Sequence, residues 1–243
     1  MRTVSDNFGL IPDGPEMLAS APVELRGSKL VHTAWAQYTI PVHGQGRLPS
    51  CAGHAWANVV ELLVIRDHGK GVFGEHGQLN GDAVWERARE MFHGGSLDGG
   101  LTLKQAFLAC KDLGILDPDC GMETVGRDLS RCCEWLDHAP LVVGHRVWPD
   151  WYGASRENGY IAASPIPSDA GGHAVVLDRV LEHGGEPYPG GINSWEDFGW
   201  HSLYCMSLGM WQASIVSVPV APVPGAAWKS WRGWERHLIE VRG

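Results

Sequence analysis

The chain has 243 residues, 44% of them apolar, and a formal net charge of −9. This length is sufficient for one sizeable core or for two packed lobes. The acidic balance and the lack of a long basic run exclude nucleic acid and acidic membrane surfaces as expected partners. No stretch approaches the roughly 18 uncharged apolar residues of a membrane span, and the N-terminus has no signal-peptide core.

The first half of the chain is expected to be mostly helical, over residues 51 to about 138, after an irregular lead-in over residues 1–50. Apolar residues recur at helical spacing in four segments, at 51–68, 82–93, 102–113 and 127–137. Thr102 and Gln105 form a capping box for the third segment. Glycines are expected to end the first three segments, at Gly69, Gly94 and Gly114.

Between residues 140 and 218, the spacing of the apolar residues changes from that of helices to that of strands. Short strand-like runs, separated by glycine and proline turns, occur at 141–143, 174–177, 203–206 and 214–218. Helices followed by strands predict an α+β fold with a helical N-terminal lobe and a sheet-rich C-terminal lobe. The cleft between two such lobes would bring Cys51 opposite His173.

Residues 219–225, with the sequence PVAPVPG, predict an extended linker that follows a domain spanning residues 1–218. Three tryptophans then follow at three-residue steps, Trp228, Trp231 and Trp234. Such a stripe favours a terminal helix packed on the core. A docking tail for a partner or a wall component is the alternative.

Cys51 lies where the sequence predicts the start of the first helix, with Pro49 and Ser50 as the helix entry and Ser50 as the N-cap. A thiol at a helix N-terminus sits at the positive end of the macrodipole, which favours the thiolate. Gly53 keeps the next turn slim, so that a substrate could approach. Gln45 is the candidate donor for a developing oxyanion, beside the backbone N–H of Cys51. An isolated cysteine is more often a small core residue, but the downstream residues favour a nucleophile.

His173 and Asn193 are the candidate partners of that thiol. His173 begins an apolar run after Gly172, so a strand would hold it while its ring faces the cleft. The side-chain carbonyl of Asn193 can accept from one ring nitrogen and fix the tautomer and orientation of the imidazole. Trp195 could shield this hydrogen bond from water. A satisfied structural histidine and a turn asparagine are the alternatives for either residue alone.

The chain resembles the papain family of cysteine peptidases in several short motifs between residues 22 and 208. Residues 40–46, IPVHGQG, are similar to the family's Thr-Pro-Val-Lys-Asn-Gln-Gly segment, and Gln45 stands at the family's spacing of six residues before the nucleophile. Residues 172–175 resemble the catalytic histidine strand, and residues 193–195 resemble the asparagine motif. The resemblance implies a papain-like two-lobe fold, with an antiparallel β-barrel-like C-terminal lobe, and a Cys-His-Asn mechanism.

Gly99 and Gly100, followed by a helix, resemble the family's Gly-Gly segment. Because no side chain stands there, an extended peptide could approach and hydrogen-bond to the backbone. A plain turn into the helix that starts near Thr102 is the alternative. We expect Gly99, Gly100 and Trp195 to bind the substrate.

Several positions depart from the family's pattern. Ala52 replaces the tryptophan that usually follows the nucleophile, and Leu48 and Leu97 stand where the family has the two cysteines of one disulfide. Only 50 residues precede Cys51, so a long inhibitory pro-segment is not expected. The six cysteines show neither metal nor disulfide spacing. We therefore expect free thiols and a cytoplasmic or phage-associated protein rather than a secreted zymogen.

The other histidines do not predict a metal site. His54 follows Cys51 by one turn, but no second pair with ligand spacing is found. His43 and His201 could line the cleft, and solvated loop positions are the simpler expectation. We expect neither a metal nor a cofactor.

These patterns together predict a cysteine peptidase that acts on peptide or protein substrates. A cell-wall peptide amidase or endopeptidase shares the catalytic order, but such domains are smaller, and the spacing of Gln45 disfavours this class. A catalytically silent papain-like binding module is the other alternative, and the four filled catalytic roles disfavour it.

Overall fold

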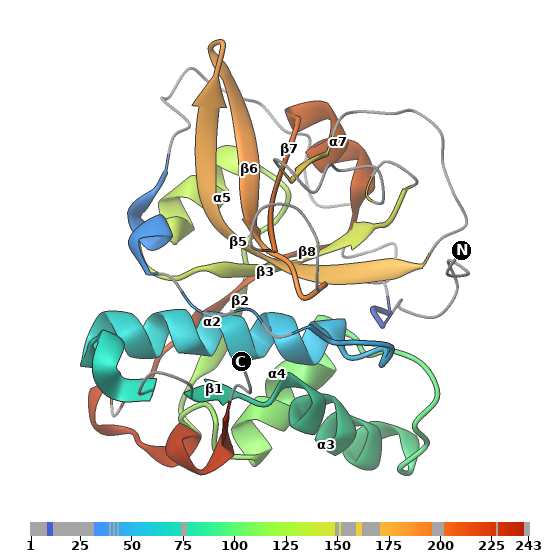
Figure 1. The fold of residues 1–243 in the computed structure, drawn as a ribbon, viewed down its shortest axis with the longest axis vertical. Coiled ribbons are helices and arrows are strands. Elements are labelled where there is room, and N and C mark those ends of the chain that lie inside the picture. The colour runs from blue at the N-terminus through green and yellow to red at the C-terminus, as the bar shows by residue number, and fades with distance from the viewer. Residues whose placement is uncertain are drawn as a thin grey trace.

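The computed structural model describes residues 9–11, 32–38, 40, 42, 44–73, 77–148, 151, 159–161, 171–195, 202–226 and 228–240. A sheet with flanking helices occupies one half of the molecule, above helix α2 in Figure 1, and a group of helices occupies the other half. This arrangement confirms the predicted α+β fold with two lobes. In the described part of the chain, no helix combines the length and apolar composition that crossing a bilayer requires.

The four predicted helices are present, as α2 (Cys51–His68), α3 (Gly81–His93), α4 (Leu103–Asp112) and α5 (Leu129–Leu136). The capping box of Thr102 and Gln105 is formed at the start of α4. Gly94 ends α3 in the left-handed conformation, with a φ of 61° that a glycine adopts without strain. Helix α5 packs against strands of the sheet, so the last predicted helix belongs to the sheet half.

Seven strands form the main sheet in the order β2-β8-β3-β5-β6-β7-β4. They are β2 (Gly121–Thr124), β3 (Leu141–Arg146), β4 (Tyr160–Ile161), β5 (Gly172–His183), β6 (Glu186–Ile192), β7 (Leu203–Met206) and β8 (Ile215–Val223). All neighbours are antiparallel except β4 and β7. The predicted runs 141–143, 174–177 and 203–206 are confirmed as strands, each within longer or equal bounds.

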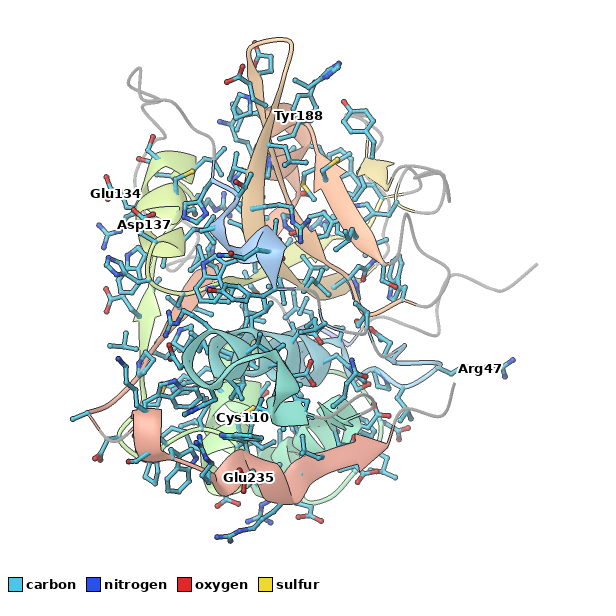
Figure 2. The ribbon with its side chains drawn as sticks, turned by 60° about the vertical axis from the view of Figure 1, so that its left-hand side comes forward. Arg47, Cys110, Glu134, Asp137, Tyr188 and Glu235 are labelled. Atoms are coloured by element: carbon cyan, nitrogen blue, oxygen red, sulfur yellow. The ribbon has the colours of Figure 1, made fainter. Side chains whose placement is uncertain are left out.

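Strand β6 and the short helix α7 (Leu208–Ser214) are elements that the sequence does not predict. Pro187 and Pro189 lie in the part of β6 that pairs with β5, whereas only residues 190–192 also pair with β7 in the described chain. A proline without N–H is tolerated at such an edge. The turn between β5 and β6 has Gly184 and Gly185 at φ of 62° and 85°, which suits a two-residue hairpin. Figure 2 shows Tyr188 near the tip of this hairpin.

The predicted linker at 219–225 is wrong, because residues 219–223 complete β8 and pair with β2. The backbone carbonyl of Pro219 accepts from Val125 N–H, while Val220 and Ala221 are buried. Burial of these apolar side chains outweighs the loss of two donors at the prolines. The predicted boundary at residue 218 therefore falls inside a strand.

The tryptophan-rich tail packs on the helical half, as predicted, but not as one helix. It forms two 3-10 turns, η3 (Trp228–Ser230) and η4 (Gly233–His237), and strand β9 (Leu238–Glu240), which pairs with β1 (Gly77–Leu79). Trp228 and Trp234 are buried, and Trp231 Nε1 donates to Gly114 O at 3.0 Å. Two further 3-10 turns are η1 (Ala34–Gln37) and η2 (Lys70–Phe73).

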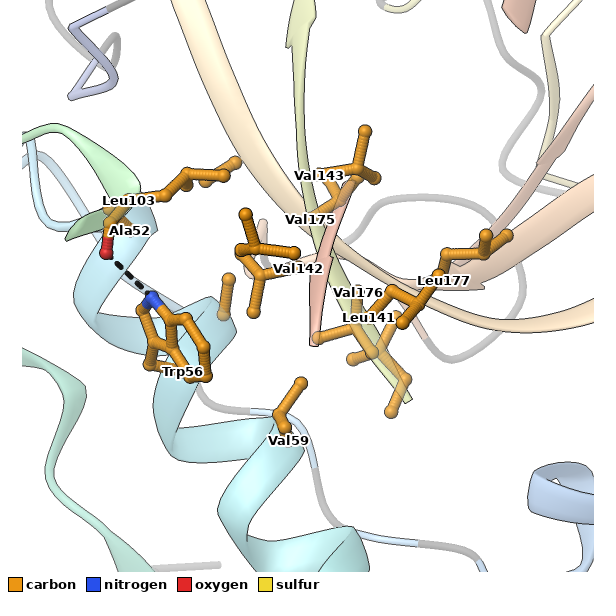
Figure 3. Close-up of a cluster of buried hydrophobic side chains, with 14 of the residues drawn as sticks. Ala52, Trp56, Val59, Leu103, Leu141, Val142, Val143, Val175, Val176 and Leu177 are labelled. Carbon is orange, nitrogen blue, oxygen red and sulfur yellow. Dashed lines mark hydrogen bonds between the residues drawn. The ribbon is translucent and has the colours of Figure 1, made fainter. Parts of the chain in front are cut away.

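Helix α2 joins the two halves through a shared apolar core. Figure 3 shows Ala52, Trp56 and Val59 of α2 directed toward valines of β3 and β5, such as Val142 and Val175. Trp56 also donates from Nε1 to Leu103 O at 2.9 Å, which ties α2 to α4. Each such large side chain contributes about 1.5–3 kcal/mol by burial. The start of α2 is thereby held against the start of β5.

Candidate active site

Cys51 is the first residue of α2 and is completely buried, with 0% of its surface exposed. Its Sγ accepts from Ala174 N–H at 3.4 Å, so the thiol lies beside the residue that follows His173. Burial raises the pKa of the Cys51 thiol to about 11, against the lowering effect of backbone donors that include Ala174 and Gly9. In this covered state the helix N-terminus alone does not produce a thiolate at neutral pH.

The first turn of α2 is fastened to the first turn of α3. Ser50 stands at the N-cap position, but its hydroxyl accepts no N–H of the helix, which corrects the predicted side-chain cap, and it donates to Asp82 Oδ1 at 2.6 Å. His54 Nε2 meets the same oxygen at 2.9 Å. A Cβ added to Gly53 would lie 2.3 Å from the carbonyl oxygen of Gly81, so the close approach requires glycine.

His54 therefore pairs with a carboxylate of the neighbouring helix. Among the described residues, no group of three or more His, Cys, Asp or Glu side chains is arranged to hold a metal ion. The six cysteines, all described, are free thiols. His43 and His201 lie outside the described residues.

His173 is the second residue of β5, and its Nε2 meets Asn193 Oδ1 at 2.7 Å. Since a carbonyl oxygen only accepts, Nε2 carries the proton, and in the neutral ring Nδ1 carries the lone pair. Nδ1 has no hydrogen-bond partner among the described residues. Burial lowers the pKa of His173 to about 4; the hydrogen bond that the ring donates to Asn193 opposes this shift, and the nearby charge of His54 adds to it.

Two tryptophans enclose the ring of His173. Trp195 stacks on it with ring centroids 4.3 Å apart and planes at 28°. Trp151 meets it edge-on, with centroids 5.9 Å apart and planes at 89°. Large aromatic faces exclude water from the His173–Asn193 bond, which strengthens it in the low-dielectric surroundings.

Gln45 is buried and linked to the residue that follows Asn193. Its N–H donates to Ser194 O at 2.8 Å, and its Oε1 accepts from Ser194 Oγ at 2.7 Å. Its Nε2 donates to Leu48 O at 2.9 Å. These bonds hold the glutamine loop and the asparagine segment as one unit, next to the start of α2.

Gly99 and Gly100 have different structural reasons for being glycine. Gly99 has a φ of 88°, which a turn requires, and its carbonyl accepts from Trp85 Nε1 at 3.2 Å. A Cβ added to Gly100 would stand 1.9 Å from Gly9 O, so Gly100 makes room for another backbone. Arg89 fastens this loop by donating to Ser96 O at 2.5 Å and to Gly100 O at 3.3 Å.

Two features of the site were not found from the sequence. His145 of β3 pairs across the sheet with His173, and its Nδ1 meets Ser214 Oγ at 2.8 Å. Burial lowers the pKa of His145 to about 3, so its ring is neutral. The second feature is the N-terminal segment, residues 9–11, which pairs with Leu101 and Gly172 beside Cys51. An isolated bridge residue, Leu10, leaves no periodicity in the sequence, and the lead-in was expected to be irregular.

No family model matches the chain, and no curated protein matches it by sequence. Solved structures do match over most of its length. Xylellain, a cysteine protease from Xylella fastidiosa, has 17% identity and a TM-score of 0.64, over 93% of this chain and 99% of that chain. Digestive procathepsin L 3 of Tenebrio molitor larval midgut has 15% identity and a TM-score of 0.64, over 90% of this chain and 76% of that chain. The bromelain protease from Ananas comosus in complex with the E64 inhibitor has 17% identity and a TM-score of 0.60, over 79% of this chain and 97% of that chain.

The chain has the papain-like cysteine protease fold. The resemblance drawn from short motifs is thus confirmed for the fold. At identities of 15–17% the similarity is one of fold, and the chemistry of this papain-like chain is argued from its own residues.

Proposed function

We propose that this papain-like chain is a cysteine peptidase that hydrolyses peptide bonds, with Cys51 as nucleophile, His173 as base and Asn193 as the group that orients the base. The observation that carries the proposal is the 2.7 Å bond between His173 Nε2 and Asn193 Oδ1. It leaves Nδ1 as the proton acceptor, on a residue whose neighbour Ala174 contacts the thiol.

The reaction starts with transfer of the Cys51 proton to His173 Nδ1 and attack of Sγ on the substrate's carbonyl carbon. The backbone N–H of Cys51 and the side-chain amide of Gln45 are the proposed donors to the oxyanion. His173 then gives its proton to the leaving amine. Water, deprotonated by His173, hydrolyses the thioester and restores the thiol.

Burial keeps both groups neutral before the reaction, since it raises the pKa of Cys51 and lowers that of His173. Proton transfer converts them together into an ion pair, and the attraction between the two charges offsets their separate desolvation costs. Trp195 shields the imidazole during this step. Gly99 and Gly100 are the proposed backbone wall for the substrate.

The decisive experiment is Cys51→Ala, assayed by mass spectrometry on a proteome-derived peptide library. Cleavage should vanish while the thermal midpoint stays near that of the wild type, because an alanine fits the space of the thiol. Cys133→Ala, at a half-buried thiol of α5, is the matched control and should cleave normally. Cleavage by the Cys51→Ala protein at the wild-type rate would show that another group is the nucleophile.

The silent-module alternative is tested by labelling with an epoxide or iodoacetamide probe, because a peptidase thiolate reacts in the native state. Peptidoglycan digestion with a panel of cross-bridge peptides tests the cell-wall alternative. Cleavage of those peptides in preference to the proteome library would favour it.

A further inference from the structure

A second histidine lies beside the proposed base on the same face of the sheet. His145 of β3 is the Cα partner of His173 of β5 in an antiparallel pairing. Residues directly opposite each other in such a pair share a face, with Cβ atoms about 4.5–5.5 Å apart. Both side chains are completely buried. The proposed mechanism uses the ring of His173 and leaves His145 without a role.

The hydrogen bonds of Ser214 fix the position of the proton on His145. The Ser214 hydroxyl donates its one proton to Met210 O at 2.7 Å. The same hydroxyl oxygen lies 2.8 Å from His145 Nδ1, so it accepts there, and Nδ1 carries the proton. Nε2 of the neutral ring then carries the lone pair, and it has no hydrogen-bond partner among the described residues.

The lone pair of His145 lies on the side of the ring that faces the base. Ser214 immediately precedes β8, and the next residue, Ile215, is the partner of His145 on that strand. Strand β3 lies between β8 and β5 in the sheet. The two nitrogens of an imidazole point to nearly opposite sides of the ring. A ring that donates from Nδ1 toward β8 therefore directs Nε2 toward β5 and His173.

Two tryptophans hold the imidazoles in a closely packed group. Trp151 contacts both, with its ring centroid 5.7 Å from that of His145 and 5.9 Å from that of His173. Trp211 packs against His145 at a centroid distance of 5.2 Å. Both tryptophans are completely buried. A fixed dipole acts more strongly in such surroundings than in water, because little solvent screens it.

Repulsion between the two rings limits the pair to one proton. Burial, and then the nearby charge of His173, lowers the pKa of His145 to about 3, whereas burial lowers the pKa of His173 to about 4. The first proton therefore goes to His173, and His145 stays neutral beside it. Other titratable or charged groups lie near the pair: Cys51 and His54 of α2, Arg127, whose Nη2 donates to Ile215 O at 3.2 Å, and the exposed Arg146 of β3.

We propose that His145 is a positioning residue for His173. Held in one tautomer by Ser214, it directs its Nε2 lone pair at the base and stabilises the imidazolium that forms when Cys51 gives up its proton. This role rests on the proposed peptidase function. In that step the S–H bond of Cys51 breaks and the proton moves to His173 Nδ1, while His145 neither gains nor loses a proton. A fixed dipole aimed at a charge that develops during the reaction lowers the barrier without having to reorganise.

Three variants separate the dipole from the packing. His145→Leu keeps an apolar side chain in the space and removes the dipole. His145→Asn can still donate from Nδ2 to Ser214 Oγ and leaves a carbonyl oxygen on the opposite side, so it restores the dipole in part. Ser214→Ala removes the acceptor that fixes the tautomer, and it carries the test if His145→Leu does not fold. The matched control is His32→Leu, at another buried histidine, whose Nε2 meets Asp137 Oδ1 at 3.0 Å.

The first readout is the 15N NMR shift of each ring nitrogen of His145 at about pH 7, where the ring is neutral. These shifts report the tautomer and need no activity. We expect the proton on Nδ1 in the wild type and a shift of the proton toward Nε2 in Ser214→Ala. A wild-type ring with its proton on Nε2 would overturn the proposal, because an N–H would then face His173.

The second readout is the pH dependence of kcat and KM on a fluorogenic peptide, with circular dichroism and the thermal midpoint as checks of folding. His145→Leu should lower kcat by about three- to tenfold with KM within about twofold, since a base weakened by one pKa unit loses at most about tenfold in proton transfer. The acid limb of kcat/KM, where His173 becomes protonated, should move to lower pH. Ser214→Ala should act in the same direction, His145→Asn should recover part of both changes, and His32→Leu should show neither.

The outcomes separate this role from the peptidase function. A wild-type kcat and an unmoved acid limb in His145→Leu would overturn the positioning role, and so would an equal loss in His145→Asn or in His32→Leu. If the wild type hydrolyses no peptide, the ring signals of His173 are followed as the pH falls. Protonation of His173 at lower pH in His145→Leu than in the wild type would then support the positioning role and overturn the peptidase. Protonation at the same pH would overturn both.

Discussion

The start of helix α2 and the N-terminal segment 9–11 both contact the thiol of Cys51, but different forces hold them. Helix α2 is fixed by the apolar core that it shares with β3 and β5. The segment is held by backbone hydrogen bonds to Leu101 and Gly172 and by the single side chain of Leu10.

This difference separates the chemistry of the site from access to it. Groups that must keep their geometry within fractions of an ångström are carried by elements with large buried surfaces. We therefore expect changes in the groups that α2, β3 and β5 hold in place to abolish activity.

Loss of the base should have the largest effect. His173→Ala removes the proton acceptor, which should lower kcat by about 10²–10⁴-fold. His138→Ala, at an exposed histidine, is the control and should be active. Steady-state kinetics on a fluorogenic peptide measure both. A fall of less than threefold in His173→Ala would remove this residue from the mechanism.

A substitution in the apolar core that α2 shares with β3 and β5 should have the next largest effect, on the free energy of unfolding. Trp56→Ala leaves a cavity between α2 and the strands and an unpaired Leu103 carbonyl, at a cost of about 3–5 kcal/mol. Urea unfolding should show this loss, together with a loss of activity. Trp135→Ala, at a half-buried tryptophan of α5, should cost clearly less. Equal costs would mean that the core around α2 is not what holds the frame.

Substitution of Gln45 tests whether its side-chain amide acts as a donor to the oxyanion. Gln45→Ala should lower kcat by about 10²–10³-fold with little change in KM, since the donor acts mainly in the transition state. Gln37→Ala, at an exposed glutamine, serves as the control. An unchanged kcat would exclude Gln45 from the oxyanion hole.

A buried carboxyl in α2 makes the frame sensitive to pH. Burial raises the pKa of Glu61 from 4.5 to about 8, while Leu79 N–H donates to its Oε1. The folded protein then holds a proton that the unfolded chain releases. Between about pH 6.5 and about pH 8, this proton should lower the stability by up to about 1.4 kcal/mol per pH unit as pH rises, whereas below about pH 6.5 the lowered pKa values of His145 and His173 act in the opposite direction.

Glu61→Gln keeps the acceptor for Leu79 and should flatten this dependence in urea unfolding between about pH 6.5 and about pH 8. Glu134→Gln, at an exposed position, should leave the wild-type slope. The same slope in Glu61→Gln would assign the pH dependence to other groups.

The orienting bond should have the smallest effect among these changes. Asn193→Ala removes one hydrogen bond to the imidazole, worth about 1.5 kcal/mol, or a loss of roughly tenfold in kcat. The stacked Trp195 still restricts the ring. A loss as large as that of His173→Ala would mean that the tautomer depends on Asn193 alone.

Local patterns in the sequence are sufficient to predict the helices and their ends. Capping at Thr102 and the glycine at 94 act within one turn of their helices, so the pattern predicts both helix ends. His173 begins a run of β-branched and apolar residues, and its strand is present. The contact between His173 and Asn193 was also predicted, because the two residue types occur in contexts that resemble a known family.

Other features depend on partners that lie far away in the chain. Pro187 and Pro189 resemble turn residues, yet β5 makes them part of a strand. The hydroxyl of Ser50 does not cap α2 but donates to Asp82, 32 residues later in the chain. The prolines at 219 and 222 resemble a linker until β2 pairs with them.

The sequence by itself determined the helices, the strands rich in β-branched residues, and the candidates Cys51, His173, Asn193 and Gln45, because these follow from contacts within a few residues or from short motifs. Only the tertiary structure decided the covering of the thiol by residues 9–11, the direction of the pKa shifts, and the pairing of residues 220–223 with β2 and of residues 238–240 with β1. Backbone pairing between segments far apart in the chain leaves no periodic pattern in the sequence, and neither does burial, since both depend on which surfaces meet in the folded protein.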